Sequence, residues 1–337
     1  MRLILHPVEL HLKHTFSISR ESRDMQPSLI IELKDGKHSG FGEATSNTYY
    51  KVTVPGMCSR LEELRSKIEA YPLFSAEDFW TYMHPELADH PFLQCALDMA
   101  AHDLAAQKAG KPLYQHWGLQ LQNLPMSNFT IGIASVDEMV EKMKEQPWPI
   151  YKIKLGTSDD LAIVRALRKH TDSLFRVDAN CAWTAEQTIA YAPELKKLGV
   201  EFIEQPLPAE QWEAMEEVYR KSVLPIVADE SCRIESDVKN CHHRFHVVNI
   251  KLTKCAGLSP ARRMIAEAKS LGIQTMVGCM TESSVGISAI GHLLPLLDYV
   301  DMDGALLLSN DPAEGVQLKD GHAIFPHRNG TGAQLKL

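Results

Sequence analysis

Residues 174–206, LFRVDANCAWTAEQTIAYAPELKKLGVEFIEQP, give the clearest indication of the fold. This stretch begins with a β-rich run, continues into an amphipathic helical pattern and ends in a second β-rich run. Thr184 and Gln187 form a capping-box pattern at the start of the helix. The stretch therefore predicts a strand–helix–strand unit whose two strands end in acidic residues, Asp178 and Glu204.

The same rhythm extends in both directions from this unit. Most gaps between the β-rich runs hold an amphipathic helical pattern, such as the one that starts with Ser135 and Glu138. The runs are NFTIGIA (128–134), YKIKL (151–155), LFRVDAN (174–180), EFIEQP (201–206), PIVADES (225–231), HVVNIKL (246–252), IQTMVGC (273–279) and YVDMDG (299–304). These evenly spaced units predict an α/β protein with a (β/α)₈-type barrel. A doubly wound sheet is disfavoured because no glycine-rich phosphate turn occurs.

The first 115 residues have a different pattern, which predicts an N-terminal α+β capping domain. Strands are expected on both sides of the turn signal Asp35-Gly36. Helices follow, and the capping-box pattern of Ser59 with Glu62 predicts the start of the first one.

Two further segments complete the predicted domain organisation. Ser75 with Asp78 and the pattern over 90–109 predict the second and third helices of the capping domain. The barrel catalytic domain is expected over 116–310, and the glycine-containing tail 311–337 is expected to return to the capping domain.

The composition is typical of a soluble globular protein, with 45% hydrophobic and 23% charged residues. The net charge of −8 and the lack of a basic run argue against a nucleic-acid or anionic-membrane partner. Neither a signal-peptide pattern nor an apolar run of transmembrane length is found, and the seven cysteines include no CxxC pair. These features predict a cytoplasmic protein with reduced thiols, and they are compatible with a homo-oligomer.

Polar residues end most of the predicted strands. Barrel enzymes carry their chemistry at the C-terminal ends of the strands. Such residues recur about every 25 positions, the length of one strand–helix unit: Thr130, Lys154, Asp178, Glu204, Asp229 and Lys251. Residues with one period lie at one height around the barrel mouth, so their side chains are expected to surround a single cavity.

Three acids on consecutive strands, Asp178, Glu204 and Asp229, are the most informative of these residues. Each alone is more often a helix N-cap or a turn residue. Together in one cavity they would repel one another unless a cation lies among them. Oxygen-only ligands suit Mg²⁺ better than Zn²⁺, with Mn²⁺ as the alternative, so the acids predict a divalent-metal site.

Three lysines accompany the acids. Lys152 and Lys154 share one face of a strand, and burying two ammonium groups against the helix layer is costly, so both are expected to face the barrel mouth. The same holds for Lys251. A free lysine has a pKa of about 10.4, which a neighbouring ammonium and a divalent cation both lower. Lys152 beside Lys154 therefore has a mechanistic interpretation, in which one cation tunes the other toward a working base.

The positions of these groups predict a reaction type. The second and sixth strands of a barrel lie on opposite sides, so Lys154 and Lys251 are expected to flank the substrate carbon from opposite faces. One base on each face is what a 1,1-proton transfer needs. The metal would bind the substrate carboxylate and stabilise the enediolate formed when the α-proton leaves.

Five short motifs carry a resemblance to a known family. In chain order they are KIK (152–154), DAN (178–180), EQP (204–206), ADES (228–231) and NIKL (249–252). With these motifs at barrel spacing, nearly the whole chain resembles the enolase superfamily, in the subgroup of muconate-lactonising enzymes. The resemblance implies that Asp178, Glu204 and Asp229 bind Mg²⁺. It also implies that Lys154 and Lys251 are the two acid/base catalysts.

The last predicted strand separates members of this subgroup. Asp301 and Asp303 resemble the DxD motif of dipeptide epimerases, where both aspartates hold the α-ammonium of the dipeptide. Two carboxylates that face the cavity away from the metal need a cation. A turn leading into Gly304 is the simpler alternative. By the same resemblance, further substrate contacts are expected from Thr130, Lys152, Cys279 and Thr281, with backbone groups serving at the last two.

The function implied by the resemblance is that of an isomerase. A dipeptide epimerase would invert the α-carbon of the C-terminal residue, and L-Ala-D/L-Glu from peptidoglycan turnover is a candidate substrate. Arg20, Glu21 and Arg23 lie in the N-terminal loop that closes over the substrate in this family, so they are candidates to contact the second residue of the dipeptide.

Two alternatives stay open at this point. A cycloisomerase or an o-succinylbenzoate synthase-type lyase of the same subgroup would use the same lysines and metal, and only the DxD motif favours the epimerase. A non-catalytic barrel that binds metal or peptide would not need both Lys154 and Lys251.

Overall fold

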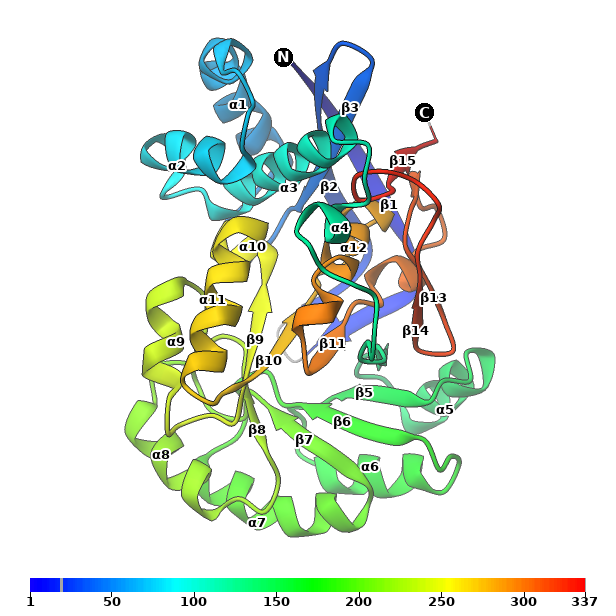
Figure 1. Ribbon diagram of the computed structural model, residues 1–337. Helices are drawn as coiled ribbons and strands as arrows, with labels where there is room; N and C mark the ends of the chain where they lie inside the picture. The colour runs from blue at the N-terminus through cyan, green and yellow to red at the C-terminus, as the bar shows by residue number, and fades with distance from the viewer. Residues whose placement is uncertain (19–20, 337) are drawn as a thin grey trace.

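The computed structural model describes residues 1–18 and 21–336 (Figure 1). The chain begins with a three-stranded antiparallel sheet in the order β1-β2-β3, formed by β1 (Arg2–Ile18), β2 (Glu21–Asp35) and β3 (His38–Thr45). Asp35 pairs with His38 at the predicted turn, where Gly36 has a φ of 61°, a conformation that glycine adopts without strain. The sheet and the helices after it form a cap over one end of the barrel (Figure 1).

The cap helices are α1 (Val54–Ala70), α2 (Ala76–Leu87), α3 (Pro91–Lys108) and the short α4 (Leu113–His116). The predicted start of α1 at Ser59 is wrong. Thr53 is the N-cap, and its side chain accepts a hydrogen bond from the Gly56 N–H at 3.2 Å. Val54 and Met57 are buried and extend the apolar face of the helix by more than a turn beyond the capping-box pattern. The predicted cap at Ser75 is confirmed.

The barrel forms as predicted, with eight parallel strands in chain order among the described residues. They are β4 (Phe129–Ile131), β5 (Ile150–Lys154), β6 (Leu174–Asp178), β7 (Val200–Glu204), β8 (Ile226–Ala228), β9 (Val247–Lys251), β10 (Gln274–Gly278) and β11 (Tyr299–Asp301). A parallel bridge between Ser127 and Val300 joins the first strand region to the last. The surrounding helices are α5 (Val136–Glu145), α6 (Asp160–Arg168), α7 (Ala185–Lys197), α8 (Trp212–Lys221), α9 (Glu235–Cys241), α10 (Leu252–Cys255), α11 (Leu258–Ser270) and α12 (Ser284–Gly291).

The alternation of side chains along each strand explains where the polar site lies. Phe202 and Val227 lie two positions before Glu204 and Asp229 and share their faces, and with Val247 and Met276 they form a small buried apolar cluster. This cluster lies in the lower barrel interior, where the guanidinium of Arg176 contacts the Phe202 ring. The interior above it is left to the polar residues at the C-terminal ends of the strands.

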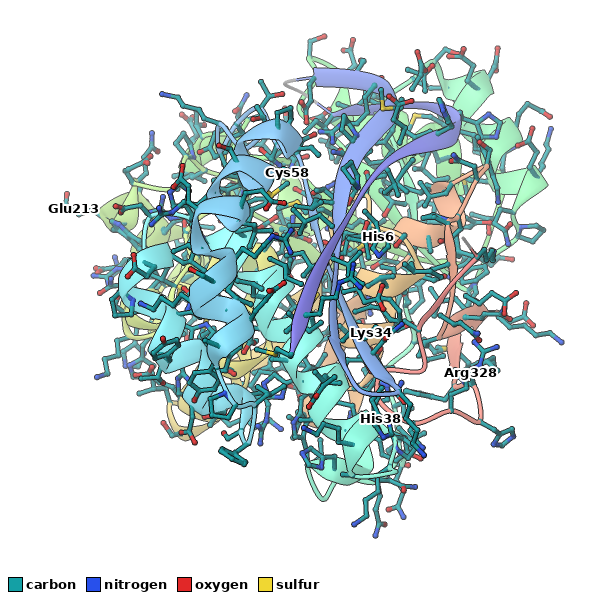
Figure 2. The ribbon with its side chains drawn as sticks, turned by 90° about the horizontal axis from the view of Figure 1, so that it is seen from above. His6, Lys34, His38, Cys58, Glu213 and Arg328 are labelled. Atoms are coloured by element: carbon teal, nitrogen blue, oxygen red, sulfur yellow. The ribbon has the colours of Figure 1, made fainter. Side chains whose placement is uncertain are left out.

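The tail contains β12 (Ala313–Glu314), β13 (Gln317–Lys319), β14 (His322–Ile324) and β15 (Gln334–Leu335). Its backbone is bonded to the cap helices: the Leu113 N–H donates to Gly330 O, and the Thr331 N–H donates to Asp103 Oδ1, both at 2.7 Å. Figure 2 shows the N-terminal sheet, labelled at Lys34, between α1 and the tail. The boundaries at residues 115 and 310 stay predictions. Among the described residues, no helix has both the length and the apolar character needed to cross a membrane.

Candidate active site

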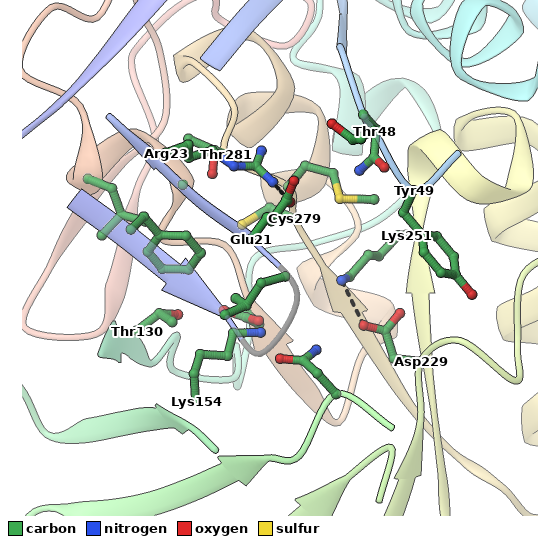
Figure 3. A pocket seen from close by; sticks show the side chains of 18 of the residues that line it. Glu21, Arg23, Thr48, Tyr49, Thr130, Lys154, Asp229, Lys251, Cys279 and Thr281 are labelled. Atoms are coloured by element: carbon green, nitrogen blue, oxygen red, sulfur yellow. Dashed lines mark hydrogen bonds and ion pairs between the residues drawn. The ribbon is translucent and has the colours of Figure 1, made fainter. Parts of the chain in front are cut away.

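A cavity of about 270 Å³ opens at the C-terminal ends of the barrel strands (Figure 3). The hairpin β1–β2 reaches across it, and Ser17 O accepts a hydrogen bond from the Ile133 N–H at 2.9 Å. The residues predicted from the sequence that line this cavity are Thr130, Lys154, Asp229, Lys251, Cys279, Thr281, Asp301 and Asp303. The other three, Lys152, Asp178 and Glu204, are fully buried. Lys152 pairs with Asp301 and Asp178 pairs with Lys154, whereas Glu204 pairs with Lys152.

The three predicted metal ligands converge on one point. Asp178 and Glu204 end β6 and β7, and Asp229 follows β8 directly. Each offers one oxygen, and these oxygens lie within 4.8 Å of one another. Burial and the Asp178 charge raise the pKa of Glu204 to about 7. Glu204 Oε2 forms an ion pair with Lys152 Nζ at 2.7 Å. Three buried carboxylates whose oxygens lie this close together form an all-oxygen group that fits a divalent cation.

Lys152 lies beneath the cavity. It connects the acidic ring, formed by Asp178, Glu204 and Asp229, to the last strand. Its Nζ is 2.7 Å from Glu204 and from Asp301 and 3.2 Å from Asp178, and its side chain is fully buried. Burial lowers the pKa of Lys152, but the attraction of the carboxylates outweighs it and holds the pKa well above its ordinary value. Its ammonium is thus fixed by protein carboxylates, and its predicted substrate contact stays a prediction.

Lys154 and Lys251 approach the cavity from facing sides. They end β5 and β9, four strands apart in the sheet order, and Figure 3 shows them on opposite sides of the cavity with Nζ pointing inward. Lys154 Nζ lies 2.6 Å from Asp178 Oδ2, and Lys251 Nζ lies 2.7 Å from Asp229 Oδ2. Their side chains are 10% and 13% exposed, enough to contact a bound molecule.

The surrounding charges keep Lys251 and its partner Asp229 ionised. Burial lowers the pKa of Lys251, but the attraction of Asp229 and Glu204 outweighs it and raises the pKa above its ordinary value. Conversely, burial raises the pKa of Asp229, and the attraction of Lys251 and Lys254 brings it well below the usual range. A cation among the acids would reduce the hold of Asp229 on Lys251, in the direction that a working base requires.

The two aspartates of the last strand have different partners. Asp301 accepts hydrogen bonds from Lys152 Nζ and Asn128 Nδ2, both at 2.7 Å. Asp303 accepts one from the Thr130 N–H at 2.5 Å, and no ion pair to it is found in the described part of the chain. Burial and the charge of Asp301 raise the pKa of Asp303 to about 7. A cationic group in the cavity would therefore find its carboxylate partner in Asp303.

Two contacts to the predicted metal-ligand carboxylates, from Lys254 and Asn180, were not expected from the sequence. The period of the strand ends includes Lys251 but not Lys254. Lys254 lies beyond β9, on α10, and its Nζ donates to Asp229 Oδ1 at 2.5 Å. Asn180 has a φ of 43°, and its N–H donates to Asp178 Oδ1 at 2.9 Å. The spacing of strand ends could not reveal either contact, because both arise from loop geometry beyond the strands.

The cap contributes residues to the same cavity. Glu21 and Arg23, on one face of β2, both line it and form an ion pair with each other. Arg23 also donates to Gln26 Oε1. Tyr50, from the segment between β3 and α1, also lines the cavity, and no sequence pattern marked it. Arg20 lies outside the described residues.

The fold and the site together define a class. A (β/α)₈ barrel with an N-terminal cap, three carboxylates on consecutive strands and facing lysines is an enolase-superfamily enzyme. The chain belongs to the mandelate racemase/muconate lactonizing enzyme family: residues 2–118 match its N-terminal domain, and residues 134–337 match the enolase C-terminal domain-like family.

Relatives of known name are similar over nearly the full length. An L-Ala-D/L-amino acid epimerase of Flavobacterium johnsoniae is 60% identical, over 99% of this chain and 100% of that protein. An L-Ala-D/L-Glu epimerase of Bacteroides thetaiotaomicron is 36% identical, over 98% and 87%. The structure of a dipeptide epimerase from Enterococcus faecalis V583, complexed with Mg and the dipeptide L-Leu-L-Tyr, superimposes with a TM-score of 0.92, 29% identity and 98% coverage of each chain.

Proposed function

We propose that this protein is a Mg²⁺-dependent dipeptide epimerase that inverts the α-carbon of the C-terminal residue of a dipeptide by a two-base 1,1-proton transfer. The observation that carries the proposal is the pair of facing lysines in a cavity that also contains Asp301 and Asp303. The names of the relatives support it, since several are dipeptide or L-Ala-D/L-amino acid epimerases.

The acidic ring has a binding role in this proposal. Asp178, Glu204 and Asp229 would hold Mg²⁺, or Mn²⁺ with the same oxygen donors. When bound, the metal supplies positive charge that attracts the substrate carboxylate and lowers the free-energy cost of removing the adjacent proton. Because all three acids are buried at one end of the barrel, they also fix where that carboxylate lies.

The lysines move the protons. One of them, as the neutral amine, takes the α-proton on its own face of the substrate. The other, as the ammonium, gives a proton to the opposite face, and the configuration is inverted. Lys154 and Lys251 exchange these roles when the other epimer is the substrate, because the reaction is reversible. The positions of the two Nζ groups on opposite sides of the cavity suit this division.

The N-terminal end of the dipeptide is assigned to the last strand. Asp303 and Asp301 would bind the α-ammonium, with Asp303 as the closer partner because Asp301 already holds Lys152. Lys152 would then act on the substrate through Asp301. The other predicted substrate contacts are Thr130, whose backbone orients Asp303, and the backbone groups of Cys279 and Thr281, which line the cavity.

The side chain of the second residue would lie under the hairpin. Glu21 and Arg23 offer a carboxylate and a guanidinium that already neutralise each other. Arg23 is therefore not reserved for an acidic side chain, and we propose that neutral side chains are accepted besides that of Glu. L-Ala-D/L-Glu from peptidoglycan turnover would be one substrate among several. A cytoplasmic location suits such a small-molecule substrate, and all seven cysteines are free thiols.

Deuterium exchange tests this function directly. L-Ala-L-Glu, L-Ala-L-Leu and L-Ala-L-Lys are incubated with the protein and Mg²⁺ in D₂O, and ¹H NMR follows loss of the α-proton and growth of the other epimer. We expect exchange for more than one side-chain class, with loss of epimerisation in Lys154→Ala and Lys251→Ala. Lys144→Ala, at a position 61% exposed on α5, is the matched control. No exchange across a broad dipeptide panel would falsify the proposal.

A variant of Glu21 tests whether the side chain of the second residue lies under the β1–β2 hairpin. Glu21→Gln removes the charge that neutralises Arg23, so the preference for L-Ala-L-Glu over L-Ala-L-Leu in kcat/KM should rise, by about tenfold for one charge pair released in the cavity. An unchanged ratio would contradict the assignment of the hairpin but not the reaction.

A further inference from the structure

Lys254 lies beside the acidic ring and has no part in the proton transfers proposed above. It belongs to α10, and its side chain is only 1% exposed. Its Nζ donates to Asp229 Oδ1 and to the carbonyl oxygen of Asp229, both at 2.5 Å, and to the carbonyl oxygen of Cys232 at 3.2 Å. The ammonium therefore has an acceptor for each of its three N–H donors.

The carboxylate of Asp229 is shared between two ammonium groups. Lys251 Nζ lies 2.7 Å from Oδ2, and Lys254 Nζ lies 2.5 Å from Oδ1. Lys251 lines the cavity, whereas Lys254 is buried behind Asp229. Because the two ammonium groups repel each other, each one offsets part of the attraction between Asp229 and the other. The geometry thus connects Lys254 to Lys251 through Asp229.

A purely structural role is the simpler interpretation, since the two carbonyl acceptors tie α10 to the loop after β8. A neutral donor would serve that purpose. Burying a charged group is costly unless a counter-charge compensates it, and the counter-charge here is a predicted metal ligand. The third bond, to Asp229 Oδ1, is the one that a structural tie does not require.

We propose that Lys254 is a positioning residue, which fixes the Asp229 carboxylate for the metal and leaves Lys251 free to reach the substrate α-carbon. This inference rests on the proposed epimerase function. Without Lys254, the Asp229 carboxylate can turn. Its attraction for the Lys251 ammonium is then no longer offset by a second cation. Metal binding and the proton transfer by Lys251 should then both weaken. Lys154 should be affected less, because its partner is Asp178 at 2.6 Å.

The test separates the two lysines. L-Ala-L-Glu and L-Ala-D-Glu are each incubated in D₂O with saturating Mg²⁺, and the initial rate of α-deuterium incorporation is measured by NMR. Each epimer presents its α-proton to one of the two lysines. That lysine is identified by the variant, Lys154→Ala or Lys251→Ala, in which the epimer no longer incorporates deuterium. For Lys254→Met we expect exchange on the Lys251 side to fall about tenfold more than on the Lys154 side. We also expect the Kd for Mg²⁺, from calorimetry of the dipeptide-free protein, to rise about tenfold.

Controls separate positioning from folding. Lys254→Arg keeps a cation and should recover part of both losses, whereas Lys144→Met should change neither. If circular dichroism shows that Lys254→Met is unfolded, Lys254→Gln, which keeps a neutral donor, is measured in its place. Equal losses for the two epimers, or an unchanged Kd for Mg²⁺, would overturn the inference. Lack of exchange in the unaltered protein would instead count against the epimerase function itself.

Discussion

The barrel mouth and the joint between cap and barrel both bury carboxylates, but they surround them differently. At the mouth, Asp229 is held between the ammonium groups of Lys251 and Lys254. At the joint, Asp98 on α3 accepts hydrogen bonds from the N–H and the hydroxyl of Ser259 on α11, at 2.8 and 2.7 Å. The first environment is cationic, and the second is a set of neutral donors.

The pKa values of Asp229 and Asp98 are shifted in opposite directions. Burial raises the pKa of Asp229, yet its lysines bring it well below the usual range. Burial raises the pKa of Asp98 to about 7, and the bonds from Ser259 do not offset it. Asp103, which accepts bonds from two backbone N–H groups, behaves in the same way, with a pKa raised to about 7.

The joint also contains three residues that resemble a catalytic triad but have a structural role. Asp98, His102 and Ser259 form a hydrogen-bonded set, with His102 Nε2 at 2.9 Å from Ser259 Oγ. These are the residue types of a hydrolytic triad. All three are buried, none lines the cavity at the barrel mouth, and burial lowers the pKa of His102 to about 3. The set joins the cap to the barrel, and charge compensation by lysine is what distinguishes Asp229 from Asp98 and Asp103.

The largest effect is expected from removing the central cation of the mouth. Lys152→Met leaves Asp178, Glu204 and Asp301 without their shared ammonium, and uncompensated buried charge costs about 3–5 kcal/mol. We expect loss of detectable epimerisation and a lower free energy of unfolding, measured by NMR exchange and by urea unfolding. Lys144→Met, on the exposed face of α5, is the control. Activity near that of the unaltered protein would show that the buried carboxylates of the mouth do not need the Lys152 ammonium.

A smaller effect is expected at the edge of the same network. Asp301→Asn keeps the shape of the side chain but removes one of the carboxylates that hold Lys152 and the substrate ammonium. We expect kcat/KM for L-Ala-L-Glu to fall by about a hundredfold, since a buried ion pair loses one partner. Asp320→Asn, at an exposed turn, should have no effect. A lyase whose substrate lacks an ammonium group would lose only the part of this effect that arises through Lys152, so its activity should fall much less.

Much of this organisation could be predicted from the sequence, because strand ends follow a regular period. The ends of β5 to β9 bring Lys154, Asp178, Glu204, Asp229 and Lys251 to one height, and their order along the chain becomes their order around the barrel. The DxD pair of the last strand could be predicted for the same reason.

The unpredicted parts depend on geometry that has no period. Lys254 reaches Asp229 only because α10 turns back immediately after β9. The pairing of Glu21 with Arg23 depends on the packing of the hairpin over the mouth. The charge tuning expected between Lys152 and Lys154 did not allow for the three carboxylates that bind Lys152. Pairwise reasoning from spacing omits such shared partners.

The smallest effect is expected at the joint between cap and barrel, where Asp98 is buried among neutral donors. The folded pKa of Asp98, about 7, exceeds the ordinary value of 3.8, so the folded state keeps a proton that the unfolded state loses as pH rises. Its contribution to stability is therefore largest below pH 4, falls between about pH 4 and 7, and is constant above. Asp98→Asn cannot ionise, so this part of the pH dependence should disappear.

Urea unfolding at pH 5 and at pH 8 measures the difference. In the unaltered protein, Asp98 should make the free energy of unfolding about 2–3 kcal/mol lower at pH 8 than at pH 5, at about 1.4 kcal/mol per pH unit. The other titrating groups contribute equally to both proteins and cancel in the comparison. Asp35→Asn, where Lys108 lowers the pKa of an exposed carboxylate, should leave the pH 5 to pH 8 difference unchanged. If Asp98→Asn also leaves it unchanged, then Asp98 is ionised in the folded state, and the neutral donors of the joint stabilise a charge as well as the lysines of the mouth do.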